Sequence, residues 1–168
     1  MSSELETHDE IYFYGHRSGK YACFSNFYPA TFTGDGITFN CSEQYFMYQK
    51  CLLFDADNTE LLKKILSSID PAKVKRFGRQ VNNFNEDIWK NHRELVMCSA
   101  VTLKFSQNNN MKKILLDTGA KMLYEASNQD KIWGIGYYAD DALANKNSFG
   151  INLLGKCLVK VRDDLKTK

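Results

Sequence analysis

A chain of 168 residues, 25% charged and 43% hydrophobic, has the composition of one compact globular domain. The formal net charge of +2 excludes a basic field over the whole molecule, so any contact with nucleic acid must be a local patch. No apolar run approaches ~18 residues, and the first ten residues are unlike a signal or transit peptide. We therefore expect a cytoplasmic protein, with the nucleus as the alternative, and no membrane association.

The expected elements begin with a disordered tail over residues 1–9, ahead of one folded domain over residues 10–168. The apolar, aromatic stretch 11–15 is typical of a strand. Residues 32–39 predict a β-hairpin, because Gly-Asp-Gly at 34–36 suits a tight turn between two short apolar runs.

Helical periodicity and capping residues dominate the rest of the chain. They predict helices near residues 42–53, 59–67, 71–78, 86–105, 110–117 and 151–166. A further strand is expected at 121–126 and a glycine-containing loop at 127–150. This order predicts an α+β fold, a mostly helical single domain with a small antiparallel sheet near the N-terminus.

The stretch NCSEQYFMYQK, residues 40–50, places Glu43 and Lys50 in an aromatic, core-like segment. On a helix the two residues share one face and lie two turns apart, roughly 10 Å along the axis. If that face is buried, both charges need compensation, and a bound substrate is one source of it. The alternative is structural: Glu43 closes a capping box with Asn40, and Lys50 extends to water.

Three other stretches are candidates for binding. Asn26 and Phe27 suit a ligand hydroxyl and a stacked ring, or else an aromatic strand with a turn-forming Asn. The segment DKIWGIG, residues 130–136, joins a carboxylate, an indole and glycines that permit close backbone approach, although such glycine loops are common. The basic residues at 73–79 form either a phosphate site or a solvated helix face. The cysteines lack C-x-x-C spacing and the histidines lack a ligand pattern, so we predict no metal and no cofactor.

The motifs together resemble the NADAR family, also called YbiA-like, over nearly the whole chain, from about Tyr12 to Arg162. The resemblance rests, in order, on FSNFYP, SEQYFMYQK, the KxxGR of residues 75–79, Trp89, DKIWGIG and GINLLG. One departure is Phe149, where a tryptophan is expected in many members; Asn152 remains in place.

The resemblance implies an N-glycosidase that cleaves the bond between ribose C1 and an exocyclic amine. It implies removal of ADP-ribose from the amino group of guanine in nucleic acid, DNA or RNA, which the local basic patch would contact. The alternative substrate is a ribosylamino-pyrimidinone phosphate of riboflavin biosynthesis. A non-catalytic ADP-ribose-binding module is a third, different class.

The family's acidic positions correspond to Glu43 and Asp130, which would stabilise an oxocarbenium-like sugar or activate water. Lys50, desolvated among aromatic residues, is our candidate for a Schiff-base nucleophile. The expected substrate-binding residues are Asn26, Phe27, Gln44, Arg79, Trp89, Trp133, Gly134 and Asn152.

Overall fold

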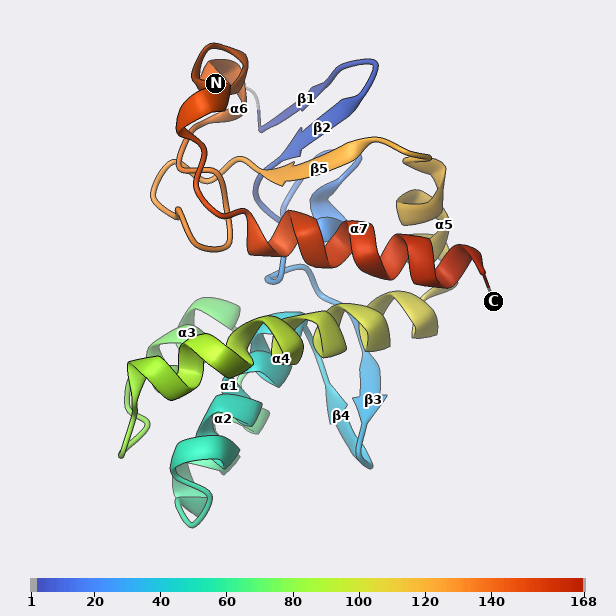
Figure 1. Ribbon diagram of the computed structural model, residues 1–168. Coiled ribbons are helices and arrows are strands. Elements are labelled where there is room, and N and C mark those ends of the chain that lie inside the picture. Colours follow the sequence, from blue (N-terminus) through green and yellow to red (C-terminus); the bar gives the residue numbers. More distant parts are fainter. Residues whose placement is uncertain (1–2, 168) are drawn as a thin grey trace. The chain divides into compact units, whose positions relative to one another are not determined.

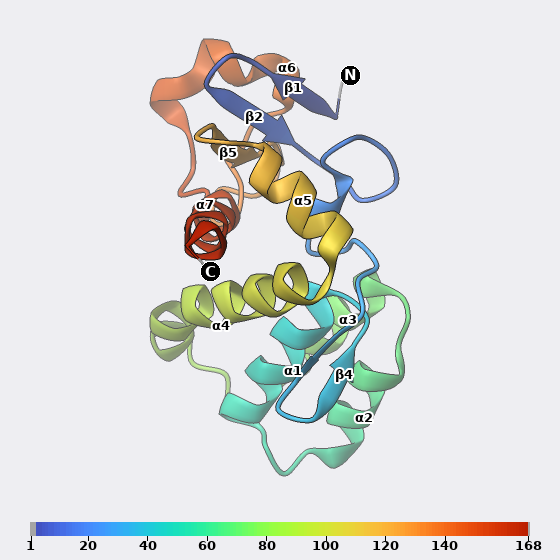
Figure 2. The same ribbon diagram turned by 90° about the vertical axis from the view of Figure 1, so that its right-hand side faces the viewer.

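The computed structural model describes residues 3–167, and the chain forms two compact units. One unit is Pro29–Asn108, and the other combines the segments before and after it in the sequence. Each unit has its own small sheet and its own helices (Figures 1 and 2). The predicted α+β class is therefore confirmed. Within the described residues, no helix has the length and apolar character needed to cross a membrane.

The first unit is built on a mixed sheet of three strands in the order β1-β2-β5. Strand β2 (Glu10–Phe13) pairs antiparallel with β1 (Glu4–Glu6) and parallel with β5 (Met122–Glu125). Helix α7 (Leu153–Lys166) lies along β5 (Figure 1) and buries an apolar stripe that includes Leu154, Leu158 and Val161. The parallel pair was not predicted, because an antiparallel sheet was expected.

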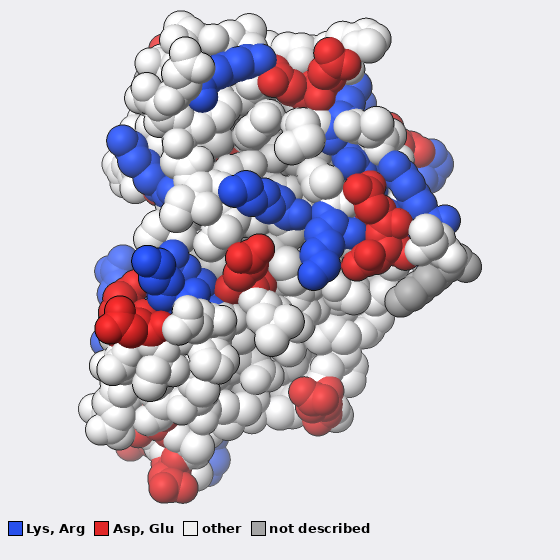
Figure 3. Space-filling view, viewed as in Figure 1, with Lys and Arg blue, Asp and Glu red and all other residues white. Residues whose placement is uncertain are grey.

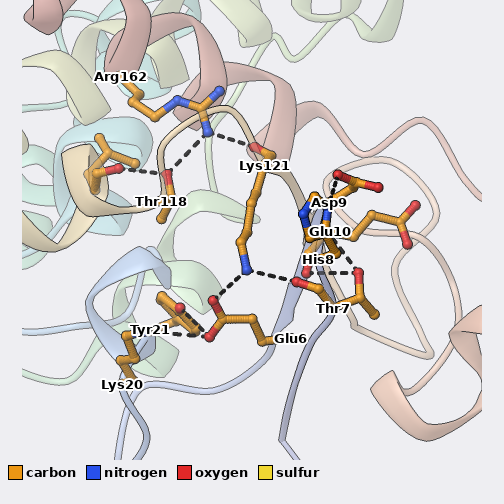
Figure 4. A network of polar contacts seen from close by, with 11 residues as sticks. Glu6, Thr7, His8, Asp9, Glu10, Lys20, Tyr21, Thr118, Lys121 and Arg162 are labelled. Carbon is orange, nitrogen blue, oxygen red and sulfur yellow. Dashed lines mark hydrogen bonds and ion pairs between the residues drawn. The ribbon is translucent and has the colours of Figure 1, made fainter.

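Strand β1 corrects the predicted tail over residues 1–9. Glu6 accepts hydrogen bonds from Lys121 Nζ at 2.8 Å and from the Tyr21 hydroxyl at 2.7 Å (Figure 4). Glu4 accepts a 2.7 Å bond from the main-chain N–H of Tyr21. These contacts join the acidic segment to distant parts of the unit, so the prediction of disorder was wrong for residues 4–6; residues 1 and 2 lie outside the described part.

The second unit opens with the predicted hairpin, formed by β3 (Phe32–Gly34) and β4 (Ile37–Phe39). Asp35 and Gly36 have φ values of 52° and 79°, the left-handed conformation that a two-residue hairpin turn requires. Four helices follow, as predicted to within two residues at each end: α1 (Ser42–Phe54), α2 (Thr59–Ser67), α3 (Pro71–Gly78) and α4 (Glu86–Gln107).

Local capping explains why three of these helices begin where they do. The side chains of Asn58, Asp70 and Asn85 accept hydrogen bonds from main-chain N–H groups in the first turns of α2, α3 and α4. Helix α1 packs against both α3 and α4 and is therefore central to this unit.

The remaining elements belong to the first unit. They are a 3-10 turn η1 (Ala22–Phe24), helix α5 (Asn109–Asp117), and the short helical turns α6 (Ala139–Ala142) and η2 (Leu143–Ser148). The last two fall within residues 127–150, for which a loop was predicted.

Candidate active site

Glu43 lies in the first turn of α1 and is only 6% exposed. The positive end of the helix dipole favours a carboxylate at this position. The structure does not support the capping-box alternative, because the main-chain N–H of Asn40 donates to Gln44 Oε1, at 2.8 Å, and Cys41 is the N-cap residue. Burial raises the pKa of the neighbouring Cys41 thiol to about 11, which makes that sulfur a poor nucleophile at neutral pH.

Gln44 has a structural role that replaces its predicted role in binding ribose. Besides accepting from Asn40, its amide Nε2 lies 3.0 Å from the main-chain oxygens of Ile65 and Leu66 and 3.2 Å from that of Ser68. The side chain is 1% exposed. Gln44 therefore ties the start of α1 to the end of α2, and its polar atoms are already engaged.

Lys50 is half-buried, and its amine is surrounded by groups of the same unit. Its Nζ donates a 2.9 Å hydrogen bond to the oxygen of Gly78 and lies 4.4 Å from the ring centroid of Phe84. Burial lowers the pKa of Lys50, whereas the charges of Glu86 and Glu43 oppose that shift. The alternative in which Lys50 merely extends to water is thus not what the structure shows.

Trp89 is packed rather than open. Its ring centroid lies 4.9 Å from that of Phe46 and 6.2 Å from that of Phe54, and the residue is 6% exposed. The ring joins α4 to α1, and the predicted role of Trp89 as a surface for base stacking stays a prediction. The ring still borders the amine, with Lys50 Nζ 5.8 Å from its centroid.

Arg79 is exposed at the C-cap of α3, and its charge helps to lower the pKa of Lys50. The other residues of the basic cluster are exposed too: Lys73, Lys75 and Arg76. On the face presented in Figure 3, basic side chains lie beside acidic ones, in keeping with the net charge of +2. A phosphate contact by Arg79 stays a prediction.

Sequence reasoning missed the groups that surround Lys50, namely Gly78, Phe84 and Glu86. The glycine of KxxGR offered a signal, because glycine permits close approach. A Cβ on Gly78 would overlap the side chain of Met47, so glycine lets the end of α3 lie close to that side chain of α1.

Asn26 and Phe27 belong to the first unit, directly after η1. The Oδ1 atom of Asn26 is buried and has no hydrogen-bond partner within residues 3–167. Phe27 is half-buried, with its ring centroid 5.7 Å from that of His16. A buried acceptor of this kind is suited to a ligand hydroxyl, and that role stays a prediction.

Asp130 shapes the DKIWGIG loop of the first unit. Its Oδ1 accepts hydrogen bonds from the main-chain N–H groups of Ile132 and Trp133, both at 2.8 Å. A Cβ on Gly134 would come within 2.7 Å of the main-chain oxygen of Glu125, so glycine allows the loop to lie close to the end of β5. The predicted chemical roles of Asp130, the half-buried Trp133 and Gly134 stay predictions.

Asn152 holds the main chain rather than lying open to a ligand. Its Oδ1 accepts from the N–H of Glu125 at 3.1 Å, and its Nδ2 donates to the oxygen of Leu123 at 2.9 Å. It is 4% exposed, has φ 56°, and begins α7 as the N-cap residue. The clamp joins α7 to β5, which corrects the prediction of substrate binding. Phe149, the departure from the family pattern, packs with its ring centroid 5.4 Å from that of Tyr124.

Comparisons with known proteins agree with this fold and these motifs. The sequence profile of the NADAR domain matches residues 12–166, which span both units. A protein named N-glycosidase from Acanthamoeba polyphaga mimivirus is 38% identical over 95% of this chain and 98% of its own length. A protein named riboflavin biosynthesis protein from Vibrio vulnificus is 33% identical over 92% of this chain, which covers 38% of that relative.

The NMR structure of the Escherichia coli protein YbiA has the same fold. It superimposes with a TM-score of 0.77 at 29% identity and covers 98% of this chain and 89% of its own. The class defined by fold and motifs is thus the YbiA-like α+β class. The chain belongs to the NADAR domain family.

Proposed function

We propose that the protein is an N-glycosidase that hydrolyses the bond between ribose C1 and an exocyclic amine. The observation that carries this proposal is the arrangement on α1. A half-buried lysine with a lowered pKa lies two turns from a buried carboxylate, and the charge of Glu43 acts on Lys50. The mimivirus relative with this activity in its name matches nearly the whole chain.

The lowered pKa of Lys50 suits a nucleophilic amine, because only the neutral form attacks carbon. A glycosylamine in its ring-opened form is an imine at C1. The Lys50 amine adds to C1, and the base amine leaves with a proton, which gives an imine between C1 and Nζ. Water then adds to C1 and the bond to Nζ breaks, which releases the sugar aldehyde and the free lysine.

Glu43 has two uses in this chemistry. In the imine route it carries protons between water, Lys50 and the departing amine. In a direct hydrolysis it stabilises positive charge on the sugar ring or activates the attacking water. Borohydride reduction separates the routes, because only the imine route leaves a covalent adduct on Lys50.

The substrate that we propose is guanine carrying ADP-ribose on its amino group in nucleic acid. The exposed residues Lys73, Lys75, Arg76 and Arg79 are proposed to contact the polymer. Such contacts are electrostatic, so the affinity for a modified oligonucleotide should fall as salt concentration rises. The predicted cytoplasmic or nuclear location fits this substrate.

A second candidate is a ribosylamino-pyrimidinone phosphate, an intermediate of riboflavin biosynthesis. The name of the Vibrio vulnificus relative favours it. Both substrates contain the same type of C1–amine bond, so the chemistry at Lys50 and Glu43 is the same for both. They differ in what lies beyond the ribose: a diphosphate with adenosine, or one phosphate.

The test offers both substrates to the wild-type protein and compares kcat/KM. Faster release of ADP-ribose from the modified oligonucleotide supports the first substrate. Faster cleavage of the pyrimidinone phosphate replaces it with the second. Tight binding of ADP-ribose without turnover of either substrate would overturn the enzymatic proposal in favour of a binding module.

A further inference from the structure

Arg93 is a buried cation on α4 that the reaction described above does not use. Its side chain is 9% exposed, and its Nε atom is buried with no hydrogen-bond partner in the described part of the chain. Its Nη1 lies 3.6 Å from Glu86 Oε1, but the Glu86 side chain is 64% exposed. A buried guanidinium with one weak, solvent-facing ion pair still has N–H donors, including Nε–H, that need a hydrogen-bond acceptor.

Arg93 belongs to the face of α4 that meets α1. Helix positions three and four apart lie on one side, so Glu86, Trp89 and Arg93 share a face. Along that face, Glu86 acts on Lys50 and Trp89 packs on Phe46.

The two helices run in opposite directions. A Cβ on Gly34 would contact both Leu103, near the end of α4, and Tyr45, near the start of α1. Lys50 therefore lies beside the turn of α4 that contains Glu86, and Phe46 lies beside the turn that contains Trp89. Arg93 lies one turn beyond Trp89 on this face, on the side away from Glu86, and Glu43 lies one turn from Phe46 on the side away from Lys50.

We propose that Arg93 binds a phosphate group attached to the ribose of the substrate. Glu86 holds Nη1, which leaves the Nε edge, where Nε–H and Nη2–H form a fork that matches two phosphate oxygens. Both candidate substrates carry phosphate on the ribose, so this inference rests on the proposed function and deepens it. Arg93 would then give the enzyme its specificity for phosphorylated over unphosphorylated ribosylamines.

The experiment compares a ribosylamine substrate with and without its 5′-phosphate. Arg93→Lys keeps the charge but lacks the Nε fork, and Arg93→Ala removes both. We expect each variant to lose roughly 10- to 100-fold in kcat/KM with the phosphorylated substrate, as for a lost hydrogen bond to a charged group. The kcat/KM with the unphosphorylated substrate should change little in either variant. Lys90→Ala, which removes an exposed cation from α4, is the matched control and should alter neither.

Equal losses with both substrates would overturn the inference, because Arg93 would then act through Glu43 or through the fold. No loss with either would overturn it as well. Thermal melting verifies that the Arg93→Lys variant is folded.

Calorimetric binding of ribose 5-phosphate and of ribose separates this inference from the proposed function. If the wild type hydrolyses nothing but binds ribose 5-phosphate more tightly than Arg93→Lys does, the enzymatic proposal fails and the role of Arg93 stands. If the wild type turns over both substrates and Arg93→Lys binds ribose 5-phosphate as well as the wild type does, the enzymatic proposal stands and the role of Arg93 in binding phosphate fails.

Discussion

The Nζ atom of Lys50 donates a 2.9 Å hydrogen bond to the main-chain oxygen of Gly78, the last residue of α3. This bond fixes the amine between α1 and α3. A Cβ at position 78 would overlap the side chain of Met47, so a side chain there would require Met47 or the end of α3 to move. The position of the proposed nucleophile is thus coupled to the packing of two helices.

Gly78→Ala should reduce activity by displacing the end of α3 and with it the acceptor of the Lys50 hydrogen bond. We expect a fall of roughly tenfold or more in kcat, since small displacements of a reacting group are costly. Ala72→Gly, in the first turn of α3 and outside the basic cluster, is the control for changes to this helix. Steady-state kinetics check the prediction, and unchanged kcat in Gly78→Ala would contradict it.

Lys50 should form a borohydride-trappable adduct during turnover, detected by mass spectrometry of the peptide that contains it. Because burial lowers the pKa of Lys50, the neutral amine becomes available at a lower pH than for an ordinary lysine. Trapping should therefore increase with pH through that lowered pKa and then level off. Lys50→Arg, which keeps the positive charge, should show no adduct; an adduct on another lysine would refute the assignment.

Gln44→Ala should unfold more readily than the wild type, rather than fail selectively in substrate binding. The substitution removes the Gln44 partner of the buried main-chain oxygen of Ile65 and of the half-buried main-chain N–H of Asn40. Leaving such groups unsatisfied costs about 1–3 kcal/mol. Denaturant titration measures the loss, and Gln49→Ala on the same helix is the matched control. A normal stability with a raised KM would instead restore the predicted role in ribose binding.

Glu6→Gln should destabilise the protein in a pH-dependent way. Hydrogen bonds from Lys121 and Tyr21 lower the pKa of Glu6 to about 2, from an ordinary value of 4.5. The ionised carboxylate therefore stabilises the fold fully above pH 4.5, and this stabilisation is lost as pH falls toward 2. Because the side chain is 37% exposed, the loss should stay below about 1 kcal/mol.

Thermal melts of wild type and Glu6→Gln between neutral pH and pH 2 check the predicted direction of this pH dependence. The two melting curves should differ at neutral pH and converge toward pH 2. A difference that persists at the acidic end would mean that the carboxylate's charge is not the cause.

The helices of the second unit could be predicted closely because their signals are local. Asn58, Asp70 and Asn85 cap helices a few residues away, and Asp35-Gly36 turns the hairpin within its own segment. Strand β1 was missed because its acidic residues are held by partners such as Lys121, far along the chain.

The roles of the amide side chains could not be predicted for the same reason. Gln44 and Asn152 match family motifs, but their partners lie more than twenty residues away, at Ile65 and at Leu123. A motif match cannot distinguish an amide that binds a ligand from one that holds the main chain. Lys50 and Glu43 could be proposed from the sequence because charges in an aromatic segment need a physical explanation. Glu86 and Arg93 on the facing helix gave no such signal.

If α1 carries the chemistry, the rates of wild type and Glu43→Gln should differ on an oligonucleotide bearing ADP-ribose on guanine. We predict that the wild type releases free ADP-ribose and unmodified guanine, and that Glu43→Gln, of nearly the same size, is slower by roughly 100-fold or more. Release at the same rate by both proteins would contradict a role for Glu43. Release by neither, with either candidate substrate, would contradict the assignment of an N-glycosidase.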